Sequence, residues 1–217
     1  MLRLLDLQKQ LILTHLGPGD VAVDFTMGNG YDTEFLCRTV GEQGHVYAFD
    51  VQKQAVDSTA ARLQSVDCPK CYTLIHDSHH KVLDYVKGPI KAGMFNLGYL
   101  PGGDKSITTM RVTTMPAIEA AISLLGPRSI LSVAIYPGHE EGDLEGKMVS
   151  EYLATLDRFR VSVAQIKIIN SPTSPYFMVV ETKYRSFYGN FSKIPPAFAA
   201  HRVHGGCNCH GYFPSHT

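Results

Sequence analysis

The sequence predicts an α/β protein with a mostly parallel sheet of seven strands, helices on both faces and an antiparallel hairpin strand at the C-terminal end. Short apolar runs alternate with amphipathic segments along most of the chain, which is typical of parallel strands joined by helices. The last two apolar runs, 160–169 and 175–183, are separated only by Asn170-Ser-Pro-Thr-Ser and therefore indicate a hairpin. At 217 residues, the chain can form one domain without a disulfide or metal.

The expected elements follow in chain order. A first amphipathic helix has leucines spaced three or four residues apart and ends at Gly17-Pro-Gly. Strands are expected where short apolar runs occur, at 21–25, 45–50, 71–76, 90–96 and 129–135. Helices are expected between and after them, at 31–40, 52–64, 79–86, 108–125 and 144–156. A loop rich in glycine and proline, 98–104, precedes the longest of these helices.

Composition limits the classes of function. Twenty lysines and arginines balance 20 aspartates and glutamates, which excludes nucleic-acid binding by bulk charge alone but not through a local basic patch. No apolar run approaches the roughly 20 residues that span a bilayer, so we expect no membrane partner. Five cysteines, an odd number, favour a reducing compartment. We expect a cytoplasmic protein, or an organellar one from which a transit peptide has been removed.

The C-terminal segment differs from the rest of the chain. Residues 182–217 contain four basic residues, no acidic residue, four histidines and seven aromatic residues. The remaining chain carries 16 basic and 20 acidic residues, so a net charge of +4 in this segment faces −4 elsewhere. We therefore divide the chain into a main domain, 1–183, and a basic, aromatic extension, 184–217, which could clamp RNA, form a dimer contact or be disordered.

Ligands of doubly wound sheets bind at the carboxyl ends of the strands. After the first strand, the run from Asp24 to Gly30 provides two glycines for a tight turn, followed by the free N–H groups of a helix N-terminus. The second strand ends in Asp50, 20 residues after Gly30, where a carboxylate can accept hydrogen bonds from ribose hydroxyls. An ordinary loop and a helix cap are the structural alternatives.

The third and fourth strands end in groups suited to a base or an amine. His76-Asp77-Ser78-His79 offers a carboxylate or hydroxyl for an adenine amino group, although Asp77 and Ser78 suit a helix cap equally well. Asn96-Leu-Gly-Tyr-Leu-Pro combines an amide, backbone carbonyls and an aromatic ring, which can accept hydrogen bonds from an amine and stack on a base. A glycine/proline turn with a satisfied asparagine is the alternative.

Four runs together resemble the motifs of the MnmM (YtqB) family: Asp24-Phe-Thr-Met-Gly-Asn-Gly-Tyr-Asp-Thr33, Gly44-His-Val-Tyr-Ala-Phe-Asp-Val-Gln52, His76-Asp-Ser-His79 and Phe95-Asn-Leu-Gly-Tyr-Leu-Pro-Gly-Gly-Asp-Lys105. The resemblance covers about 4–183 and includes Tyr136-Pro-Gly-His139. Members are class I, Rossmann-like methyltransferases that use S-adenosylmethionine to methylate the aminomethyl group of the tRNA wobble uridine, giving 5-methylaminomethyl-(2-thio)uridine. This chain departs from the family pattern at Tyr31, commonly histidine, and at Phe25 and Met27, commonly small residues.

The resemblance implies roles for the motif residues. S-adenosylmethionine would be held by Asp24, Thr26, Gly28, Asn29, Gly30, Asp32, Thr33, Asp50, Gln52, Asp77, Ser78 and His79. The catalytic residues would be Asn96, Tyr99 and His79. The substrate would contact Leu97, Gly98, Tyr99, Lys105, Arg111, Tyr136 and His139. The implied partner is tRNA, bound through its anticodon loop, and the sequence leaves a homodimer open.

Methylation of an amine requires its neutral form. A free alkylamine titrates near the lysine value of about 10.4, so desolvation or a proton acceptor must favour the neutral species. His79 and His139 are the candidates for proton acceptance, with an ordinary structural role as the alternative for each. Tyr99 could stack on a flipped uridine. Candidates for phosphate contacts, each of which could equally be a solvated surface residue, are Lys105, Arg111, Lys183 and Arg185.

Three other functions stay open. A nicotinamide-dependent oxidoreductase shares the glycines and Asp50, but Thr33 replaces the third glycine of Gly-x-Gly-x-x-Gly. A methyltransferase acting on rRNA, protein or a small molecule shares the cofactor half. A zinc-assisted RNA-binding module could use Cys68-Pro-Lys-Cys71 and Cys207-Asn-Cys209-His210. Because the first of these pairs precedes a core strand, we expect no metal.

Overall fold

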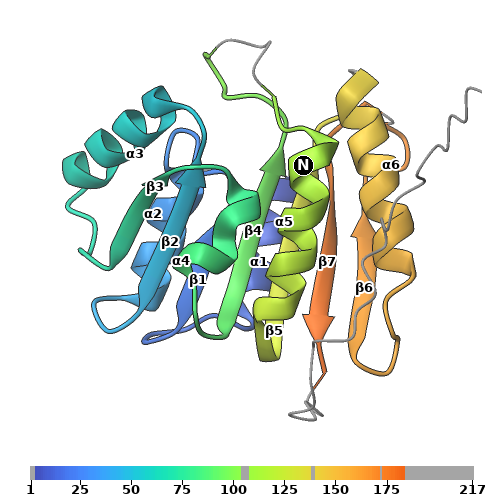
Figure 1. Ribbon diagram of the computed structural model, residues 1–217, viewed down its shortest axis with the longest axis horizontal. Helices are drawn as coiled ribbons and strands as arrows, with labels where there is room; N and C mark the ends of the chain where they lie inside the picture. The colour runs from blue at the N-terminus through green and yellow to red at the C-terminus, as the bar shows by residue number, and fades with distance from the viewer. Residues whose placement is uncertain (1–2, 104–107, 138–139, 172, 184–217) are drawn as a thin grey trace, which may run out of the picture.

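The computed structural model describes residues 3–103, 108–137, 140–171 and 173–183. Within these residues, seven strands form one sheet in the order β3-β2-β1-β4-β5-β7-β6 (Figure 1). Neighbours among the first five strands pair in parallel, and β7 is antiparallel to both β5 and β6. This confirms the predicted parallel sheet with a C-terminal antiparallel hairpin strand. The strands are β1 (Val21–Asp24), β2 (His45–Asp50), β3 (Tyr72–His76), β4 (Ile90–Leu97), β5 (Leu125–Ile135), β6 (Val161–Ile166) and β7 (Tyr176–Thr182).

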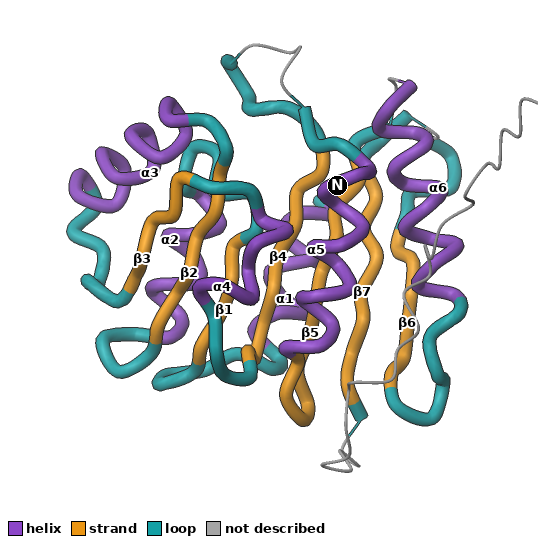
Figure 2. The backbone as a smooth tube through the Cα atoms, viewed as in Figure 1, coloured by secondary structure: helices purple, strands orange, loops and turns teal. Residues whose placement is uncertain are grey.

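Helices cover both faces of the sheet, as Figure 2 shows. One core cluster packs α1, α2 and α3 against one face, and a second packs α4, α5 and α6 against the other. In the central strand β4, Met94 belongs to the first cluster and Phe95 to the second, because successive strand residues point to opposite faces. The helices are α1 (Leu4–Leu13), α2 (Tyr31–Val40), α3 (Lys53–Ser65), α4 (Val82–Tyr85), α5 (Arg111–Leu124) and α6 (Glu140–Ala154), with a 3₁₀ turn η1 (His79–Lys81).

The structure moves some predicted boundaries. The expected helix over 79–86 is split between η1 and the single turn α4. Strand β5 begins at Leu125, directly after α5, although the glycine and proline at 126–127 indicate a turn. Its pairing with β4 jumps from Ile90↔Leu125 to Ala92↔Ile130, so the turn residues form a bulge within the strand. The described helices also include none with the length and apolarity that a bilayer span requires.

The order of the strands positions the site. Strand β1 lies between β2 and β4, so the chain reverses its direction of travel across the sheet at β1. Ligands of such sheets bind in the crevice at this switch point, beyond the carboxyl ends of the strands. The segments that follow β1, β2 and β4 are those in which the sequence predicts the site.

Candidate active site

A pocket lies at the carboxyl ends of β1, β2 and β4, beside η1 and the start of α5. Six of the twelve predicted cofactor residues line it, together with predicted substrate-side residues that follow β4. The fold thus brings together residues that lie some 70 positions apart in the sequence, such as Thr26 and Asn96. The lining residues are Phe25, Thr26, Gly28, Asp50, Val51, Gln52, Ser78, His79, Asn96, Gly98, Tyr99, Leu100, Pro101, Thr108, Thr109 and Thr113.

The turn between β1 and α2 requires its glycines. Gly30 has φ +80°, and a Cβ there would lie 3.0 Å from atoms of Thr59 on α3. Gly28 has φ +50°, and its N–H donates to Asp50 Oδ2 at 3.1 Å. The carbonyl of Gly28 accepts a hydrogen bond from the Thr59 hydroxyl at 3.0 Å. The turn is therefore fixed both to the end of β2 and to α3.

Asp50 presents a partly satisfied carboxylate to the pocket. Its Oδ2 accepts from Gly28 and its Oδ1 from the Gln52 N–H at 2.9 Å. Burial raises the pKa of this carboxyl, while the backbone hydrogen bonds oppose that rise. A carboxylate offers about four lone-pair sites, so two backbone donors leave acceptor capacity for a ligand diol.

Asp24 serves the turn rather than the pocket. It is completely buried, and its oxygens accept from the Thr33 hydroxyl at 2.6 Å and the Thr26 N–H at 3.1 Å. Burial, followed by the charge of Asp32, raises the pKa of Asp24 to about 7 against the effect of those hydrogen bonds. Asp24 and Thr33 therefore stabilise the loop from inside and do not line the pocket.

Two other predicted cofactor residues hold neighbouring segments together. Asn29 donates from Nδ2 to the Pro101 carbonyl and accepts from the Ser58 hydroxyl, both at 3.1 Å. Asp77 pairs with Lys81 at 2.9 Å and accepts from the Tyr85 hydroxyl at 2.9 Å. The hydrogen bond from Lys81 is the main cause that lowers the pKa of Asp77 to about 2. Neither side chain lines the pocket.

The Asn96 amide is held from two sides at the end of β4. Its backbone N–H donates to the Thr26 hydroxyl at 2.8 Å, and its Nδ2 donates to Asp32 Oδ2 at 2.7 Å. The other oxygen of Asp32 lies 2.8 Å from the ammonium of Lys9 on α1. Within the described part of the chain, Asn96 Oδ1 has no donor and is available to a ligand. Asp32 itself does not line the pocket, so the structure places it behind Asn96.

His79 is a neutral imidazole in the wall of the pocket. It is 8% exposed, and its ring packs edge-on against Phe95 with centroids 5.6 Å apart. Its Nδ1 lies 3.1 Å from the Phe25 carbonyl, which assigns the proton to Nδ1. Its buried Nε2 has no partner among the described residues. Burial lowers the pKa of His79 to about 4, which argues against a role as acceptor of an amine proton.

Of the three positions that depart from the family pattern, only Phe25 lines the pocket. Phe25, which lines it, stacks on Phe95 with ring centroids 4.1 Å apart. Met27 is buried beside the turn and does not line the pocket. Tyr31 is 61% exposed and packs against the guanidinium of Arg62 at 3.6 Å from its ring centroid.

The structure places only some of the predicted substrate residues in the wall of the pocket. Gly98 and Tyr99 line the pocket, whereas Leu97 is buried in the core and Arg111 pairs with Glu141 at 2.9 Å. Tyr136 is largely buried, which raises its pKa, and the charge of Asp32 adds to that rise. Two predicted residues, Lys105 and His139, lie outside the described residues, as does Arg185.

Several residues that line the pocket were not predicted from the sequence. Thr108, Thr109 and Thr113 line the pocket, as do Val51, Leu100 and Pro101. Lys9 is also missed, because a lysine on an amphipathic helix has the pattern of a solvated residue. Threonines around the start of a helix have no distinctive spacing, so nothing in the sequence could have identified these three.

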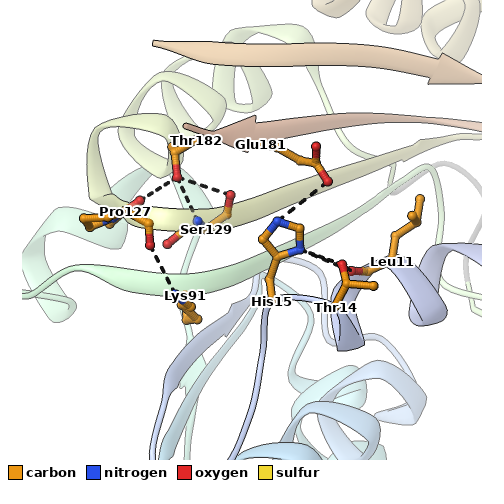
Figure 3. Close-up of polar contacts among 9 residues, drawn as sticks. Leu11, Thr14, His15, Lys91, Pro127, Ser129, Glu181 and Thr182 are labelled. Atoms are coloured by element: carbon orange, nitrogen blue, oxygen red, sulfur yellow. Dashed lines mark hydrogen bonds and ion pairs between the residues drawn. The ribbon is translucent and has the colours of Figure 1, made fainter. Parts of the chain in front are cut away.

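A second, more open cleft lies at the opposite edge of the sheet, where the predicted phosphate contact Lys183 is found. Figure 3 shows several polar contacts around this cleft. His15 lies 3.6 Å from Glu181, and Lys91 donates to the Pro127 carbonyl at 3.1 Å. Thr182 donates to the Gly126 carbonyl at 2.6 Å and accepts from the Ser129 N–H at 2.8 Å. These contacts fasten the end of α1 and the bulge of β5.

The zinc alternative finds no support in the described residues. They contain no group of three or more histidine, cysteine, aspartate or glutamate side chains that could hold a metal. Cys37, Cys68 and Cys71 are buried free thiols, and Cys71 Sγ lies 3.6 Å from the Cys37 carbonyl. The second predicted ligand group, at 207–210, lies outside the described residues.

Comparisons with known proteins agree on one group of relatives. A family model described as "Putative rRNA methylase" matches residues 46–182. A chloroplastic tRNA (mnm(5)s(2)U34)-methyltransferase of Arabidopsis thaliana is 34% identical over 168 residues, which cover 72% of this chain and 61% of that protein.

Two crystal structures match over almost their whole length. A "putative rRNA-methylase" from Clostridium thermocellum has a TM-score of 0.81 and 38% identity, covering 84% of this chain and 98% of that one. A "putative methyltransferase" from Streptococcus mutans, solved in complex with SAH, has a TM-score of 0.77 and 34% identity, covering 84% and 99%. By contrast, the chain spans only 61% of the length of the Arabidopsis relative.

Proposed function

Because the chain belongs to the family described as "Putative rRNA methylase", we propose that it is an S-adenosylmethionine-dependent methyltransferase acting on the aminomethyl nitrogen of a modified wobble uridine in tRNA. The product would be 5-methylaminomethyl-(2-thio)uridine. One observation carries the proposal: a glycine turn tied to Asp50 and an oriented amide, Asn96, line the same pocket. The first suits a nucleoside cofactor, and the second suits an amine.

The residues of the pocket fit the cofactor. Asp50 retains acceptor capacity for a ribose diol after binding two backbone N–H groups. The buried Nε2 of His79 has no partner in the described chain and can accept a hydrogen bond from an adenine amino group. Gly28 keeps the wall open, since a Cβ there would lie 3.5 Å from Leu100 and narrow the space. When bound, S-adenosylmethionine supplies a methyl group on a sulfonium, which is a good leaving group.

The chain's own residues then have to position a neutral amine. Asn96 Oδ1 accepts one N–H of the amine, which fixes the direction of the nitrogen lone pair. Tyr99, 41% exposed at the pocket rim, supplies a ring on which the uracil base stacks. Enclosure lowers the pKa of the amine from about 10.4 and so favours the neutral form. His79 does not take the proton, because burial lowers its pKa to about 4.

The choice of RNA rests on the named relative. The Arabidopsis protein is a tRNA (mnm(5)s(2)U34)-methyltransferase, and position 34 lies in the anticodon loop. We accordingly propose tRNA as the partner, bound through that loop. The same relative is chloroplastic, which favours a plastid or another organelle as the compartment, with the cytoplasm as the alternative. The main domain, 1–183, would carry the chemistry and the extension, 184–217, would add RNA affinity.

Nucleoside mass spectrometry tests the proposal. Purified protein is incubated with S-adenosylmethionine and tRNA that carries 5-aminomethyl-uridine, with or without the 2-thio group. Appearance of the methylaminomethyl nucleoside is the expected result. If SAH binds by calorimetry and no such nucleoside forms, the wobble-uridine assignment is rejected. Ribosomal RNA runs as a parallel substrate, because the family description names it, and light scattering reports whether two copies act together.

A further inference from the structure

The orientation of the Asn96 amide decides what the pocket offers to a substrate. An asparagine side chain has a donor end and an acceptor end of nearly equal size, so packing alone does not choose between them. With Nδ2 toward the pocket, the site would repel an amine N–H and leave it unbonded. With Oδ1 toward the pocket, it accepts that N–H. A neighbouring group that selects the second orientation is therefore part of the methyl-transfer site.

Asp32 is the neighbouring group that selects this orientation. Its Oδ2 accepts from Asn96 Nδ2 at 2.7 Å, and a carboxylate accepts hydrogen bonds but donates none while it is ionised. A flipped amide would bring Oδ1 against that carboxylate, and the two oxygens would repel.

Lys9 holds the other oxygen of Asp32 by an ion pair. Its ammonium lies 2.8 Å from Asp32 Oδ1, and side-chain exposure is 30% for Lys9 and 16% for Asp32. Asp32 also interacts electrostatically with the buried Asp24 beneath the glycine turn. Removing Lys9 would leave Asp32 Oδ1 without the cation that fixes this side chain between α1 and α2.

The position of Lys9 is fixed by the packing of α1. The adjacent residue, Gln8, is 1% exposed and donates from Nε2 to the Ser132 hydroxyl on β5 at 2.9 Å. The ammonium of Lys9 also lies 5.1 Å from the centroid of the Phe35 ring on α2. The helix is thus anchored beside the residue that reaches the site, and the lysine is held between a ring and a carboxylate.

We propose that Lys9 is a positioning residue for methyl transfer: through Asp32 it holds Asn96 with Oδ1 toward the pocket, so that the site accepts an amine hydrogen. This inference rests on the proposed function for its kinetic consequence. The arrangement of the three side chains does not depend on which amine is the substrate. Lys9 does not line the pocket, so it acts through Asn96 and not by contact with substrate.

Kinetics provide the first test. In Lys9→Met the aliphatic stem is retained and the charge removed, whereas Lys9→Arg keeps the charge. Arg3→Met is the matched control, because Arg3 precedes the same helix and pairs at 3.4 Å with the exposed Asp6. We expect Lys9→Met to lower the single-turnover rate roughly tenfold or more, with SAH affinity and the KM for tRNA within about twofold of wild type. Lys9→Arg should restore much of the rate, and Arg3→Met should not change it.

A double-mutant comparison tests whether Lys9 acts through Asn96. In an Asn96→Ala background, Lys9→Met should cause no further loss, because the group that it positions is gone. An equal loss in both backgrounds overturns the proposal. So does a full rate in Lys9→Met, a loss of SAH binding, or a rise in KM alone, which would make Lys9 an RNA contact.

Nuclear magnetic resonance of the side-chain amide tests the arrangement without a substrate. The Asn96 Nδ2 protons are identified by their absence in Asn96→Ala and compared among wild type, Lys9→Met and Arg3→Met, all bound to SAH. We expect the resonances to shift in Lys9→Met and stay in place in Arg3→Met; unchanged resonances in Lys9→Met overturn the proposal. If wild type binds SAH but leaves aminomethyl-uridine unmodified, the proposed substrate fails, and this spectrum still decides the role of Lys9.

Discussion

The polar side chains around the pocket fall into two groups. Some already have hydrogen-bond partners for their polar atoms within the chain, and others have acceptor capacity left for a ligand. Both oxygens of Asp24 are occupied by Thr33 and Thr26, so this carboxyl stabilises the turn. Asp50 retains acceptor capacity, and Asn96 presents an oxygen that has no donor in the described residues. The residues with spare hydrogen-bonding capacity are therefore the ones that we expect to control binding and turnover.

Asn96→Ala tests this expectation for the amine. The substitution removes Oδ1 but keeps the backbone N–H that donates to Thr26. We expect the single-turnover rate to fall by about 100-fold, because the amine loses its orienting acceptor, with SAH affinity within about twofold. Single-turnover assays and calorimetry measure the two quantities. Turnover at the wild-type rate would remove Asn96 from the mechanism.

His79 gives the stability of the protein a defined pH dependence. Burial lowers the pKa of this imidazole from 6.5 to about 4, so between these values the unfolded chain binds the proton and the folded chain does not. As the pH falls from 6.5 toward 4, His79 should therefore lower the free energy of unfolding by up to about 3 kcal/mol. Above pH 6.5 it should have no such effect. Urea unfolding of wild type and His79→Gln across this range measures it as the difference between their free energies of unfolding.

Asp24 should give the stability of the protein the opposite pH dependence. Its pKa is raised from 3.8 to about 7, chiefly by burial, so the folded chain holds the proton where the unfolded chain has lost it. Relative to Asp24→Asn, wild type should therefore lose stability as the pH rises from 4 to 7. The same urea series includes this variant. Parallel curves for wild type and either variant would show that the group titrates normally in the folded state.

At the scale of elements, the start of α2 couples backbone conformation to the site. Gly30 has φ +80° and lies against Thr59, whereas Gly41 at the other end of α2 has φ +65° and open space where a Cβ would lie. Alanine at either glycine should cost about 1–3 kcal/mol in backbone strain. Only Gly30→Ala should also weaken SAH binding, because it displaces the turn that carries Gly28 and Asn29.

Gly41→Ala is the internal control for that prediction. Urea unfolding compares the stabilities of the two variants, and calorimetry compares their SAH affinities. Equal affinities for both would mean that the turn tolerates displacement and does not shape the cofactor site.

The predictability of individual site residues follows from how local their determinants are. Asp50 could be predicted because its place at a strand end and its spacing from Gly30 are both properties of the sequence. The link from Lys9 to Asp32 could not, since it depends on how α1 packs on α2. Motif membership also does not tell which carboxylate faces a ligand. Asp24 and Asp32 occur in the same run as Gly28 but lie behind the pocket surface.

At the scale of the whole molecule, the alternation of strands and helices predicted the class of fold and its terminal hairpin. The order of the strands could not be predicted in this way, because strand pairing joins residues far apart in the chain, as in Ala22↔Ala92. The bulge at the start of β5 was missed for the same reason. Its glycine and proline indicate a turn, and only the register with β4 shows that the turn lies within a strand.

Charge is also divided at this scale, and the division predicts how RNA affinity depends on salt. The segment 182–217 carries +4 and the rest of the chain −4, and 184–217 lies outside the described residues. If the extension contacts phosphates, neutralising Arg185, Lys193 and Arg202 to glutamine should raise the KM for tRNA without changing the single-turnover rate at saturation. The slope of log affinity against log salt should fall by about 0.7–0.9 for each phosphate that the variant no longer neutralises.

A matched triple variant separates this effect from net charge. Lys70, Lys87 and Lys147 are exposed residues of the main domain and do not line the pocket, so changing them to glutamine removes the same charge elsewhere. Filter binding at several salt concentrations measures both slopes. A shallower slope only in the extension variant would assign the phosphate contacts to 184–217. Equal slopes in both variants would mean that RNA responds to overall charge, and that the main domain holds the anticodon loop without help from the extension.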